Sequence, residues 1–597
     1  MILVLGGTTE GRKAVAELEE AGTPFYYSTK TGEQDMVLHH GTRVDGAMDE
    51  TAMTLFCQRH AIRLLVDAAH PFAQVLHQTV ALVAERLHLP AIRFERIFPP
   101  RDPSIHWLDG YADLQNNLPL GGQGFTLLAT TGVQSIATLK PLEAKGVKVF
   151  YRILPRESSI RLAHQQGATD EQLCYYHEGE DERTILQELK PDAILLKESG
   201  ETGGFTEKVE AAKVLGISVF AIKRPPTPAT FHRVNGEHGL RLMVEKLLPD
   251  FFPLHSGWTT GTCATAAAVA AATRLLKGET PDEVPVVLPN GETIMVPVQY
   301  GDGYASVVKQ AGDDPDVTDG IEVRASVAPA TRFDIKGGIG VGRFTLPGFD
   351  YPVGEPAINL SPRQMIVRNL QGFGTPFTVT LSVPQGEEIA RKTFNPRLGI
   401  TGGISIIGVS GIVKPFSEAA FIESIRKCMT VAMASGSPRI VIHSGAKSEA
   451  ALRRMAPDLP PQAFVEYGNA IGETLKMVEE LHHEKGWNGE VTLGIMLGKA
   501  VKLAEGHLDT HSKKVVMNKS FIISLLREAS CPEDIIRQAE SITLARELWQ
   551  LIPAPHLEAF CHAVIQHCHR HCQPLMPHHP LTILLIDDEG HTHTAAH

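Results

Sequence analysis

Three stretches of small and hydroxyl-bearing residues could bring a backbone close to a ligand. The first, Gly6-Gly-Thr-Thr-Glu-Gly11, lies between an apolar run and a helical pattern, as in a phosphate cradle at a helix N-terminus. Thr8 replaces the second glycine of the dinucleotide fingerprint, so a tight turn between strand and helix is the alternative. We expect cofactor contacts from Gly6, Gly7, Thr8, Thr9, Glu10 and Gly11.

The second stretch, residues 256–276, begins with hydroxyl-rich residues and continues as an alanine run typical of a helix. Small residues at a helix start leave backbone N–H groups open to an anion or a polar ligand. A threonine-capped, tightly packed helix is the alternative. The candidate ligand contacts are Thr259, Thr260 and Thr262.

The third stretch, residues 395–413, has glycines among β-branched residues. Glycine lets a main chain approach a ligand where a Cβ would clash, although a bulged strand with a tight turn has the same composition. No Gly-Lys-Ser/Thr follows, so the stretch is not a P-loop.

Polar side chains follow the predicted strands of the first half. After strand 24–27, where an NAD site would place an acid, the chain has Ser28 and Lys30, which suit a 2′-phosphate and favour NADPH over NADH. Asp67 and His70 follow strand 63–67, where open parallel sheets deliver ligand-binding groups. We expect both to act in catalysis, although His70 could instead cap the next helix.

A second series of strands is predicted at 125–129, 147–152, 193–196 and 217–222, and it forms a second wall of a cleft. Thr131 and Gly132 follow its first strand as further cofactor contacts. Candidates for binding an acidic ligand on this wall are Arg152, Lys197, Ser199, Gly200 and Lys208.

Basic residues recur late in the chain. Lys499 and Lys502 share one face of a helix after strand 491–496 and could bind carboxylates, with a solvated charged face as the alternative. His511 could act as a base or orient a carboxylate, or it could be a structural histidine. The Cys- and His-rich tail, about 560–597, could bind Zn, Co or Ni, but its spacing fits no standard zinc site. We expect a partly ordered helix or a flexible tail, and we assign no metal ligands.

Composition sets the limits on these interpretations. The 597 residues are too many for one core, and 43% hydrophobic with 21% charged residues is ordinary for a soluble globular protein. A net charge of −12 argues against nucleic acid or an anionic membrane as the main partner. The chain has no apolar window long enough to span a bilayer, and its eight cysteines are no disulfide framework, so we expect a cytoplasmic protein.

The first half resembles the precorrin-6A reductase family. The resemblance covers about residues 1–248 and rests on segments 6–11, 67–73, 152–155 and 197–208. It implies an NADPH-dependent α/β half of two Rossmann-like parallel-sheet subdomains, about 1–120 and 121–248. The chain departs from the family between Arg161 and Glu182, where the family has a Gly-Pro-Phe segment and this chain reads Cys174 to Asp181.

The second half resembles the cobalt-precorrin-5B C1-methyltransferase family. This resemblance runs over about 255–550 and rests on segments 259–267, 395–408 and 498–512. It implies an α+β half, residues 255–597, that uses S-adenosylmethionine without the common methyltransferase fold. Glycine content and resemblance together place five residues at that cofactor, namely Gly399, Gly402, Gly403, Ser405 and Gly408.

The two families catalyse consecutive steps, so the resemblance implies a bifunctional enzyme. It would methylate C1 of cobalt-precorrin-5B and then reduce the cobalt-precorrin-6A product to cobalt-precorrin-6B with NADPH. Cobalt arrives in the substrate, and the basic candidates would orient the many carboxylates of the ring. A homo-oligomer and complexes with other pathway enzymes are both compatible with the sequence. The alternatives are a tetrapyrrole or cobalt carrier, a nucleotide-sugar-type oxidoreductase for the first half, and a fusion whose methyltransferase half alone is active.

Overall fold

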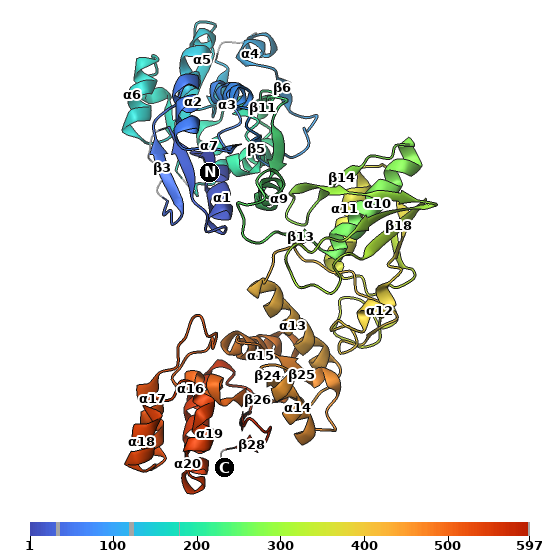
Figure 1. The fold of residues 1–597 in the computed structure, drawn as a ribbon. Coiled ribbons are helices and arrows are strands. Elements are labelled where there is room, and N and C mark those ends of the chain that lie inside the picture. Colours follow the sequence, from blue (N-terminus) through green and yellow to red (C-terminus); the bar gives the residue numbers. More distant parts are fainter. Residues whose placement is uncertain (31–35, 119–123, 178, 595–597) are drawn as a thin grey trace. The chain divides into compact units, whose positions relative to one another are not determined.

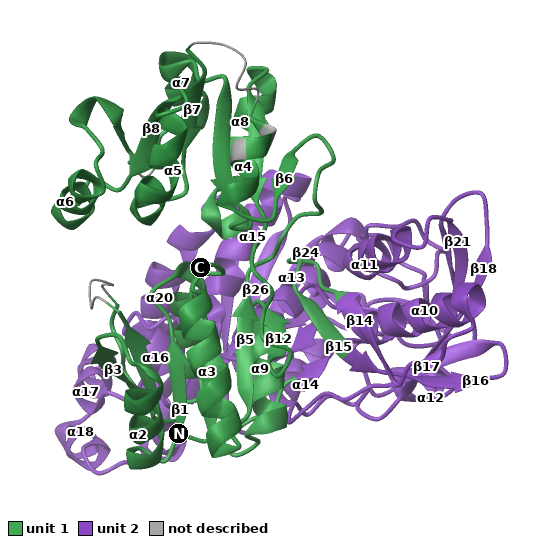
Figure 2. Ribbon diagram, turned by 90° about the horizontal axis from the view of Figure 1, so that it is seen from above, with its two compact units in different colours: residues 1–256, 287–295 green, residues 257–286, 296–597 purple. Residues whose placement is uncertain are grey.

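The computed structural model describes residues 1–30, 36–118, 124–177 and 179–594. The chain forms two compact units (Figure 2). Unit 1 is Met1–Ser256 together with Val287–Met295, and unit 2 is Gly257–Val286 together with Val296–His597. Within the described residues, no helix combines the length and the apolar character needed to cross a bilayer.

The first sheet, of which β3 and β5 are labelled in Figure 1, has eight strands in the order β14-β15-β12-β5-β4-β1-β2-β3. Strands β12 to β3 belong to unit 1, whereas most of β14 and the end of β15 belong to unit 2. The strands from β12 to β3 pair in parallel, and β15 joins β12 in the antiparallel direction at Thr293 and Asn235. The strands are β1 (Ile2–Leu5), β2 (Phe25–Thr29), β3 (Gly41–Asp45), β4 (Leu64–Asp67), β5 (Ala91–Glu95), β12 (His232–Asn235), β14 (Glu283–Val287) and β15 (Thr293–Pro297).

Helices cover both faces of this sheet because alternate strand residues are apolar on each side. Ile2 and Val4 pack with α1 (Thr9–Glu19) and α9 (Glu237–Leu247). Leu3 and Leu5 pack with α2 (Glu50–Arg59) and α3 (Gln74–Leu87). Helix α1 begins at Thr9, within the glycine turn, because the Thr8 side chain caps the helix by accepting the Gly11 N–H.

The second sheet of unit 1 is six-stranded and parallel throughout, in the order β6-β11-β10-β7-β8-β9. Its strands are β6 (His106–Leu108), β7 (Thr126–Ala129), β8 (Lys148–Ile153), β9 (Leu173–Tyr175), β10 (Ala193–Lys197) and β11 (Ser218–Ile222). Its helices are α4 (Tyr111–Asn117), α5 (Ile136–Glu143), α6 (Glu157–Gln165), α7 (Glu182–Leu189) and α8 (Phe205–Val214). The chain's mixed α/β character with several parallel sheets is therefore as the sequence predicts.

Unit 2 begins with the alanine-rich helix α10 (Thr260–Lys277), which is buried over most of its length and packs on a five-stranded sheet. The order of that sheet is β16-β17-β18-β21-β19. Its strands are β16 (Gln299–Gly301), β17 (Tyr304–Val308), β18 (Glu322–Pro329), β19 (Asp334–Gly337) and β21 (Phe377–Ser382). Around it lie α11 (Leu360–Gln371), α12 (Gly386–Ala390), and the short pairs β13 (Gly257–Trp258) with β23 (Ile412–Val413) and β20 (Arg343–Phe344) with β22 (Ile400–Thr401).

The last sheet of unit 2 has the order β25-β24-β26-β27-β28 and is parallel except for β28. Its strands are β24 (Arg439–His443), β25 (Phe464–Glu466), β26 (Glu490–Met496), β27 (Leu581–Ile586) and β28 (Thr592–His593). Its helices are α13 (Glu418–Ala434), α14 (Ala446–Met455), α15 (Ile471–Lys485), α16 (Leu497–Ala504), α17 (Lys519–Glu528), α18 (Glu533–Ala539), α19 (Leu548–Leu551) and α20 (Ala554–Cys572).

The tail is a packed part of this sheet layer, so the flexible-tail alternative is wrong for its described residues. Cys561, Cys568 and Cys572 lie on one face of α20 at helical spacing, and all three are buried in the core. Strand β27 then enters the sheet beside β26. The cysteines therefore serve packing, and the final residues, 595–597, lie outside the described part.

Candidate active sites

The glycine turn after β1 brings strand and helix into close contact. A Cβ at Gly6 would lie 2.3 Å from the Tyr27 ring, and a Cβ at Gly11 would lie 2.9 Å from the Cα of Gly6. Gly7, with φ +93°, has open space beside it, and its N–H donates to the Tyr27 hydroxyl at 3.0 Å. Two glycines thus serve packing, and the backbone around Gly7 remains accessible to a phosphate.

Positive charge gathers at the end of β2. Ser28 is buried and its carbonyl accepts the Gly6 N–H, while Lys30 is exposed. Burial raises the pKa of the Tyr27 phenol, and the charges of Arg12 and Arg43 act in the opposite direction. Arg12 donates to Thr9 Oγ1 at 3.2 Å, whereas Arg43 donates to Asp45 Oδ1 at 2.9 Å, which offsets its charge. Sequence reasoning missed Arg12, because its approach to this strand end depends on how α1 packs beside β2.

Arg96, directly after β5, connects the carboxyl ends of the two sheets of unit 1. Its guanidinium donates to Glu10 Oε2 at 2.8 Å and to the Ser199 carbonyl at 2.7 Å. Thr202 donates its hydroxyl to the same Glu10 carboxylate. Glu10 therefore holds the loop after β10, and its cofactor contact stays a prediction.

Asp67 lies at the end of β4 with no exposed surface. His77 Nδ1 lies 2.5 Å from Asp67 Oδ2, and Arg93 donates to Asp67 Oδ1 at 2.9 Å and to the Ala69 carbonyl at 2.8 Å. Burial alone would raise the pKa of Asp67, but the bonds from His77 and Arg93 hold it below its ordinary value. The carboxylate is enclosed by protein partners, so it positions the turn that carries His70.

His70 is a neutral imidazole at physiological pH. Burial and the neighbouring charges of Arg96 and Lys197 lower its pKa to about 4. The Phe72 N–H donates to His70 Nδ1 at 3.2 Å, so the neutral ring carries its proton on Nε2. The ring can donate a hydrogen bond from Nε2. It is too weak a base to be protonated near pH 7, so it cannot act there as an imidazolium acid.

Lys197 and the loop after β10 form the opposite wall. The Lys197 ammonium lies 5.2 Å from the centre of the Phe72 ring, and burial lowers its pKa. A Cβ at Gly200 would lie 2.9 Å from the Cβ of Arg96, so this glycine permits the loop to approach Arg96. Thr131 is buried and hydrogen-bonds Ser135 Oγ at 2.6 Å, while Gly132, at φ +84°, has open space beside it.

Two predicted substrate contacts are engaged within the protein. Arg152 pairs with Glu182 and lies 3.4 Å from Glu180, and its side chain is 2% exposed. The Lys208 ammonium lies 3.2 Å from the same Glu182 carboxylate. Glu180 lies within the segment that departs from the family and Glu182 directly follows it, while residue 178 is outside the described part. Arg152 and Lys208 therefore already have carboxylate partners within the protein.

In unit 2 the threonine turn and the glycine-rich stretch meet. Thr260 Oγ1 accepts the Ile407 N–H at 2.9 Å, and Thr262 donates its hydroxyl to the Gly411 carbonyl at 2.6 Å. Thr259 caps α10 by accepting the Thr262 N–H at 3.2 Å. All three hydroxyls are hydrogen-bonded within the protein, those of Thr260 and Thr262 to the glycine-rich stretch, and their role in ligand binding stays a prediction.

Most glycines of that stretch are needed for packing within the protein. A Cβ would lie 2.4 Å from the Leu346 side chain at Gly399, 2.1 Å from the Gly340 carbonyl at Gly403, and 2.2 Å from Thr259 Oγ1 at Gly408. Gly402, at φ +78°, has open space beside it. Ser405 donates to Asn395 Oδ1 at 3.2 Å. Among these four glycines, Gly402 alone has open space beside it, and the cofactor contacts of the stretch stay a prediction.

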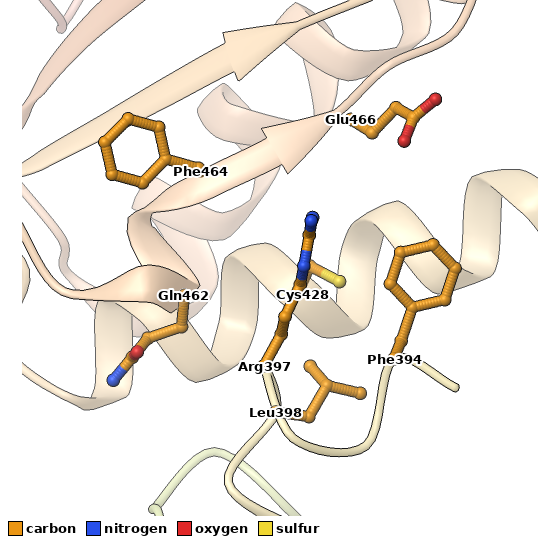
Figure 3. Close-up of a pocket in the computed structure, with 7 residues that line it drawn as sticks. All are labelled: Phe394, Arg397, Leu398, Cys428, Gln462, Phe464 and Glu466. Atoms are coloured by element: carbon orange, nitrogen blue, oxygen red, sulfur yellow. The ribbon is translucent and has the colours of Figure 1, made fainter. Parts of the chain in front are cut away.

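A small cavity of about 20 Å³ lies beside the start of the same stretch (Figure 3). It is formed where the loop 394–398 meets α13 and β25, and Glu466 belongs to its lining. A volume of this size holds little more than one water molecule. The full lining set is Phe394, Arg397, Leu398, Cys428, Gln462, Phe464 and Glu466.

The cavity adjoins the carboxyl edge of the last parallel sheet, where β24 ends at His443. His443 is fully buried, and neither ring nitrogen has a hydrogen-bond partner among the described residues. Burial lowers its pKa to about 4, against the effect of Glu449, whose carboxylate lies 3.7 Å from Nε2. Arg397 donates to that carboxylate at 2.9 Å. Sequence reasoning missed this cluster, although a strand end in a parallel sheet is a recognisable signal.

Lys499, Lys502 and His511 gather at the same edge. Lys499 donates to the Gly468 carbonyl and lies 5.6 Å from the Tyr467 ring, and burial lowers its pKa. Lys502 donates to the Thr510 carbonyl at 3.4 Å. His511 Nδ1 accepts the Lys513 N–H at 3.1 Å, which leaves Nε2 as its proton-bearing nitrogen when neutral.

Similarity to known proteins shows the family to which the second half of the chain belongs. Residues 250–415 match the family model CbiD, and residues 509–596 match the model of the CbiD C-terminal domain. A cobalt-precorrin-5B C(1)-methyltransferase of Prosthecochloris aestuarii is 44% identical over 349 residues, covering 56% of this chain and 94% of the relative. The Thermus thermophilus protein of the same name is 40% identical, covering 56% of this chain and 92% of the relative. The chain belongs to the cobalt-precorrin-5B C(1)-methyltransferase family.

The N-terminal part of the chain matches a second enzyme family. Residues 1–238 match the model described as precorrin-6x reductase CbiJ/CobK. A solved CobK precorrin-6A reductase is 20% identical over 41% of this chain and 97% of its own, with a TM-score of 0.35. The Archaeoglobus fulgidus cbiD structure is 34% identical over 40% of this chain and 76% of its own, with a TM-score of 0.25. Both resemblances stated from the sequence are confirmed at the level of family.

Proposed function

We propose that the chain is a bifunctional enzyme that methylates C1 of cobalt-precorrin-5B and reduces the resulting cobalt-precorrin-6A to cobalt-precorrin-6B. The observation that carries this proposal is the presence of both families in one chain. The product of the first reaction is the substrate of the second, so the fused chain would catalyse two consecutive steps. We assign the reductase to residues 1–248 and the methyltransferase to residues 255–597.

Unit 1 suits NADPH at the carboxyl edge of its first sheet. The strand order β3-β2-β1-β4-β5 followed by β12 is that of a doubly wound nucleotide-binding sheet. The open space beside Gly7 would admit the pyrophosphate, and Lys30 with Arg12 would hold the 2′-phosphate. When bound, NADPH supplies a hydride. Arg96 fixes the facing loop, and His70 donates a hydrogen bond from Nε2 to orient an anionic group of the ring.

Unit 2 suits S-adenosylmethionine at the carboxyl edge of its last sheet. A Cβ at Gly445 would lie 3.7 Å from Glu466 Oε1, and the φ of +152° at this position favours glycine. The Gly445 backbone therefore has no side chain beside the Glu466 carboxylate. A carboxylate beside a glycine turn fits a ribose diol and a sulfonium charge. When bound, this co-substrate supplies an electrophilic methyl group. Lys499 and Lys502 would orient ring carboxylates so that the ring carbon lies in line with the methyl group.

A single incubation series tests the proposal. The protein is mixed with S-adenosylmethionine and cobalt-precorrin-5B, with and without NADPH, and products are followed by mass spectrometry. We expect a singly methylated product that accumulates without NADPH and is reduced when NADPH is present. Glu466→Gln should lose methylation and still reduce supplied cobalt-precorrin-6A, whereas Lys30→Ala should retain methylation. An unchanged mass in both arms would instead indicate a carrier.

One observation favours a second candidate, a fusion in which only the methyltransferase half is active. Arg152 and Lys208 are neutralised by Glu182, which reduces the positive charge facing an acidic ring. Under this alternative, supplied cobalt-precorrin-6A remains unreduced at saturating NADPH. Methylation proceeds normally in the same sample.

A further inference from the structure

Three potential metal ligands from two separate segments meet beside the last sheet of unit 2. Glu479 and His483 lie four residues apart on α15, and His578 precedes β27. Their ligand atoms all lie within 4.8 Å of one another. His578 Nδ1 hydrogen-bonds Glu479 Oε1, and His483 Nε2 lies 3.3 Å from that same oxygen.

The spacing suits a small borderline cation. Bonds of about 2.1 Å at tetrahedral angles separate two ligand atoms by roughly 3.4 Å. Imidazole and carboxylate together select Zn²⁺ or Co²⁺ over Mg²⁺ or Ca²⁺, which require oxygen ligands. The His483 and His578 side chains are 64% and 54% exposed, so a cation can reach them from solvent.

Two further observations point to a ligand at this cluster. Glu479 Oε2 is buried and has no hydrogen-bond partner among the described residues. The His578 ring is held in place by stacking on His482, with centroids 4.8 Å apart and planes at 10°. His482 is itself fixed, because its Nδ1 hydrogen-bonds the Trp487 carbonyl at 2.8 Å. Groups that fix the orientation of a histidine in this way are common around metal-binding histidines.

The position of the cluster separates it from the proposed active site. Helix α15 follows β25 and returns antiparallel to the strands, so its last turns reach the edge where the parallel strands begin. His578 lies at that edge, three residues before β27 starts at Leu581. Glu466 and Lys499 lie at the opposite, carboxyl edge. A cation at the cluster would therefore join α15 to the start of β27.

We propose that Glu479, His483 and His578 bind one Zn²⁺ or Co²⁺ ion that fastens the start of β27 to α15. The group Asp587, Glu589 and His591 has comparable ligand types. Asp587 Oδ1, however, already accepts the N–H groups of Glu589 and His591, so that group forms a self-contained turn. The proposal concerns the α15 cluster alone.

The test uses the full chain after chelator treatment, with ZnCl₂ or CoCl₂ as the probe. Calorimetry should find one tight Zn²⁺ equivalent, Co²⁺ should give the visible absorption of a four-coordinate site, and Zn²⁺ should raise Tm. Glu479→Gln and His578→Gln should each weaken this equivalent on the order of tenfold or more and abolish the rise in Tm. His164→Gln, which removes another exposed histidine paired with an acid, is the matched control and should bind normally.

The far-UV circular dichroism of each variant establishes that it is folded. The proposal is overturned if the wild type binds no tight equivalent. It is also overturned if Glu479→Gln and His578→Gln retain that equivalent, or if His591→Gln is the variant that loses it.

Discussion

Lys30 is the residue on which nucleotide selectivity depends in our proposal for unit 1. It follows the buried end of β2, where an NAD-specific sheet would present a carboxylate to the ribose. Arg12 contributes further positive charge at the same strand end, whereas Arg43 is paired with Asp45 at 2.9 Å. A 2′-phosphate placed there would interact favourably with Lys30 and Arg12, whereas a ribose hydroxyl would gain little from them.

Replacing Lys30 with alanine should therefore affect one nucleotide only. We expect the Kd for NADPH to rise about tenfold and the Kd for NADH to remain unchanged, because one charge-assisted contact contributes about 1.5 kcal/mol. Fluorescence titration of the reduced nucleotide measures both constants. Lys13→Ala is the matched control, since Lys13 pairs with Glu237 at 3.4 Å. Equal losses for both nucleotides would contradict the assignment.

At the scale of elements, unit 2 depends on backbone crossings that only glycine permits. The Gly340 carbonyl would lie 2.1 Å from a Cβ at Gly403 and 2.0 Å from a Cβ at Gly386. Three distant segments therefore converge on one carbonyl with no side chain between them. Gly402 differs, because its left-handed φ is the only constraint that the described residues place on it.

Two alanine substitutions in adjacent positions separate these effects. Gly403→Ala should destabilise unit 2 by about 3 kcal/mol or more, because backbone must move to admit the methyl group. Gly402→Ala should cost only about 1–2 kcal/mol, the strain of a left-handed alanine. Urea unfolding followed by tryptophan fluorescence measures both. Similar midpoints for the two variants would show that the crossing tolerates a side chain.

The sequence predicts local elements of this fold well, and long-range convergence poorly. The strand predicted at 193–196 is observed as β10 (Ala193–Lys197), because a short apolar run is a local property. The glycines near 400 are recognised as special, but their reason lies in the approach of Gly340, far along the chain. The cluster of Arg397, His443 and Glu449 was missed for the same reason. Likewise, the sequence does not show that one face of α20 is buried, which places the cysteines of the tail in the core.

On the scale of the whole molecule, the chain returns to unit 1 after unit 2 has begun. Residues 287–295 belong to unit 1, although they follow the start of α10. Glu292 is 2% exposed, and its carboxylate accepts the N–H groups of Glu237 at 3.1 Å and His238 at 2.9 Å. It thereby caps the N-terminus of α9. Burial and the nearby Glu237 carboxylate raise the pKa of Glu292 to about 7.

This raised pKa predicts how the stability of unit 1 changes with pH. Between about pH 4.5 and 7, Glu292 is ionised in the unfolded chain and binds a proton in the folded one. Its contribution is therefore fully present below pH 4.5 and is lost as pH rises through 7. Glu292→Gln, which keeps a neutral side chain, should remove this component. Urea midpoints of both proteins from pH 4.5 to 8 measure it, and parallel curves would contradict the prediction.

The placement of Glu292 also has a consequence for biosynthesis. A ribosome must translate past residue 295 before α9 receives its cap and β12 receives its neighbour β15. A gene divided at the boundary between the two family-like halves would release an N-terminal fragment whose outermost strand is β12. Its outer N–H and C=O groups would then be available to other chains, so we expect this fragment to aggregate more readily than the fused chain.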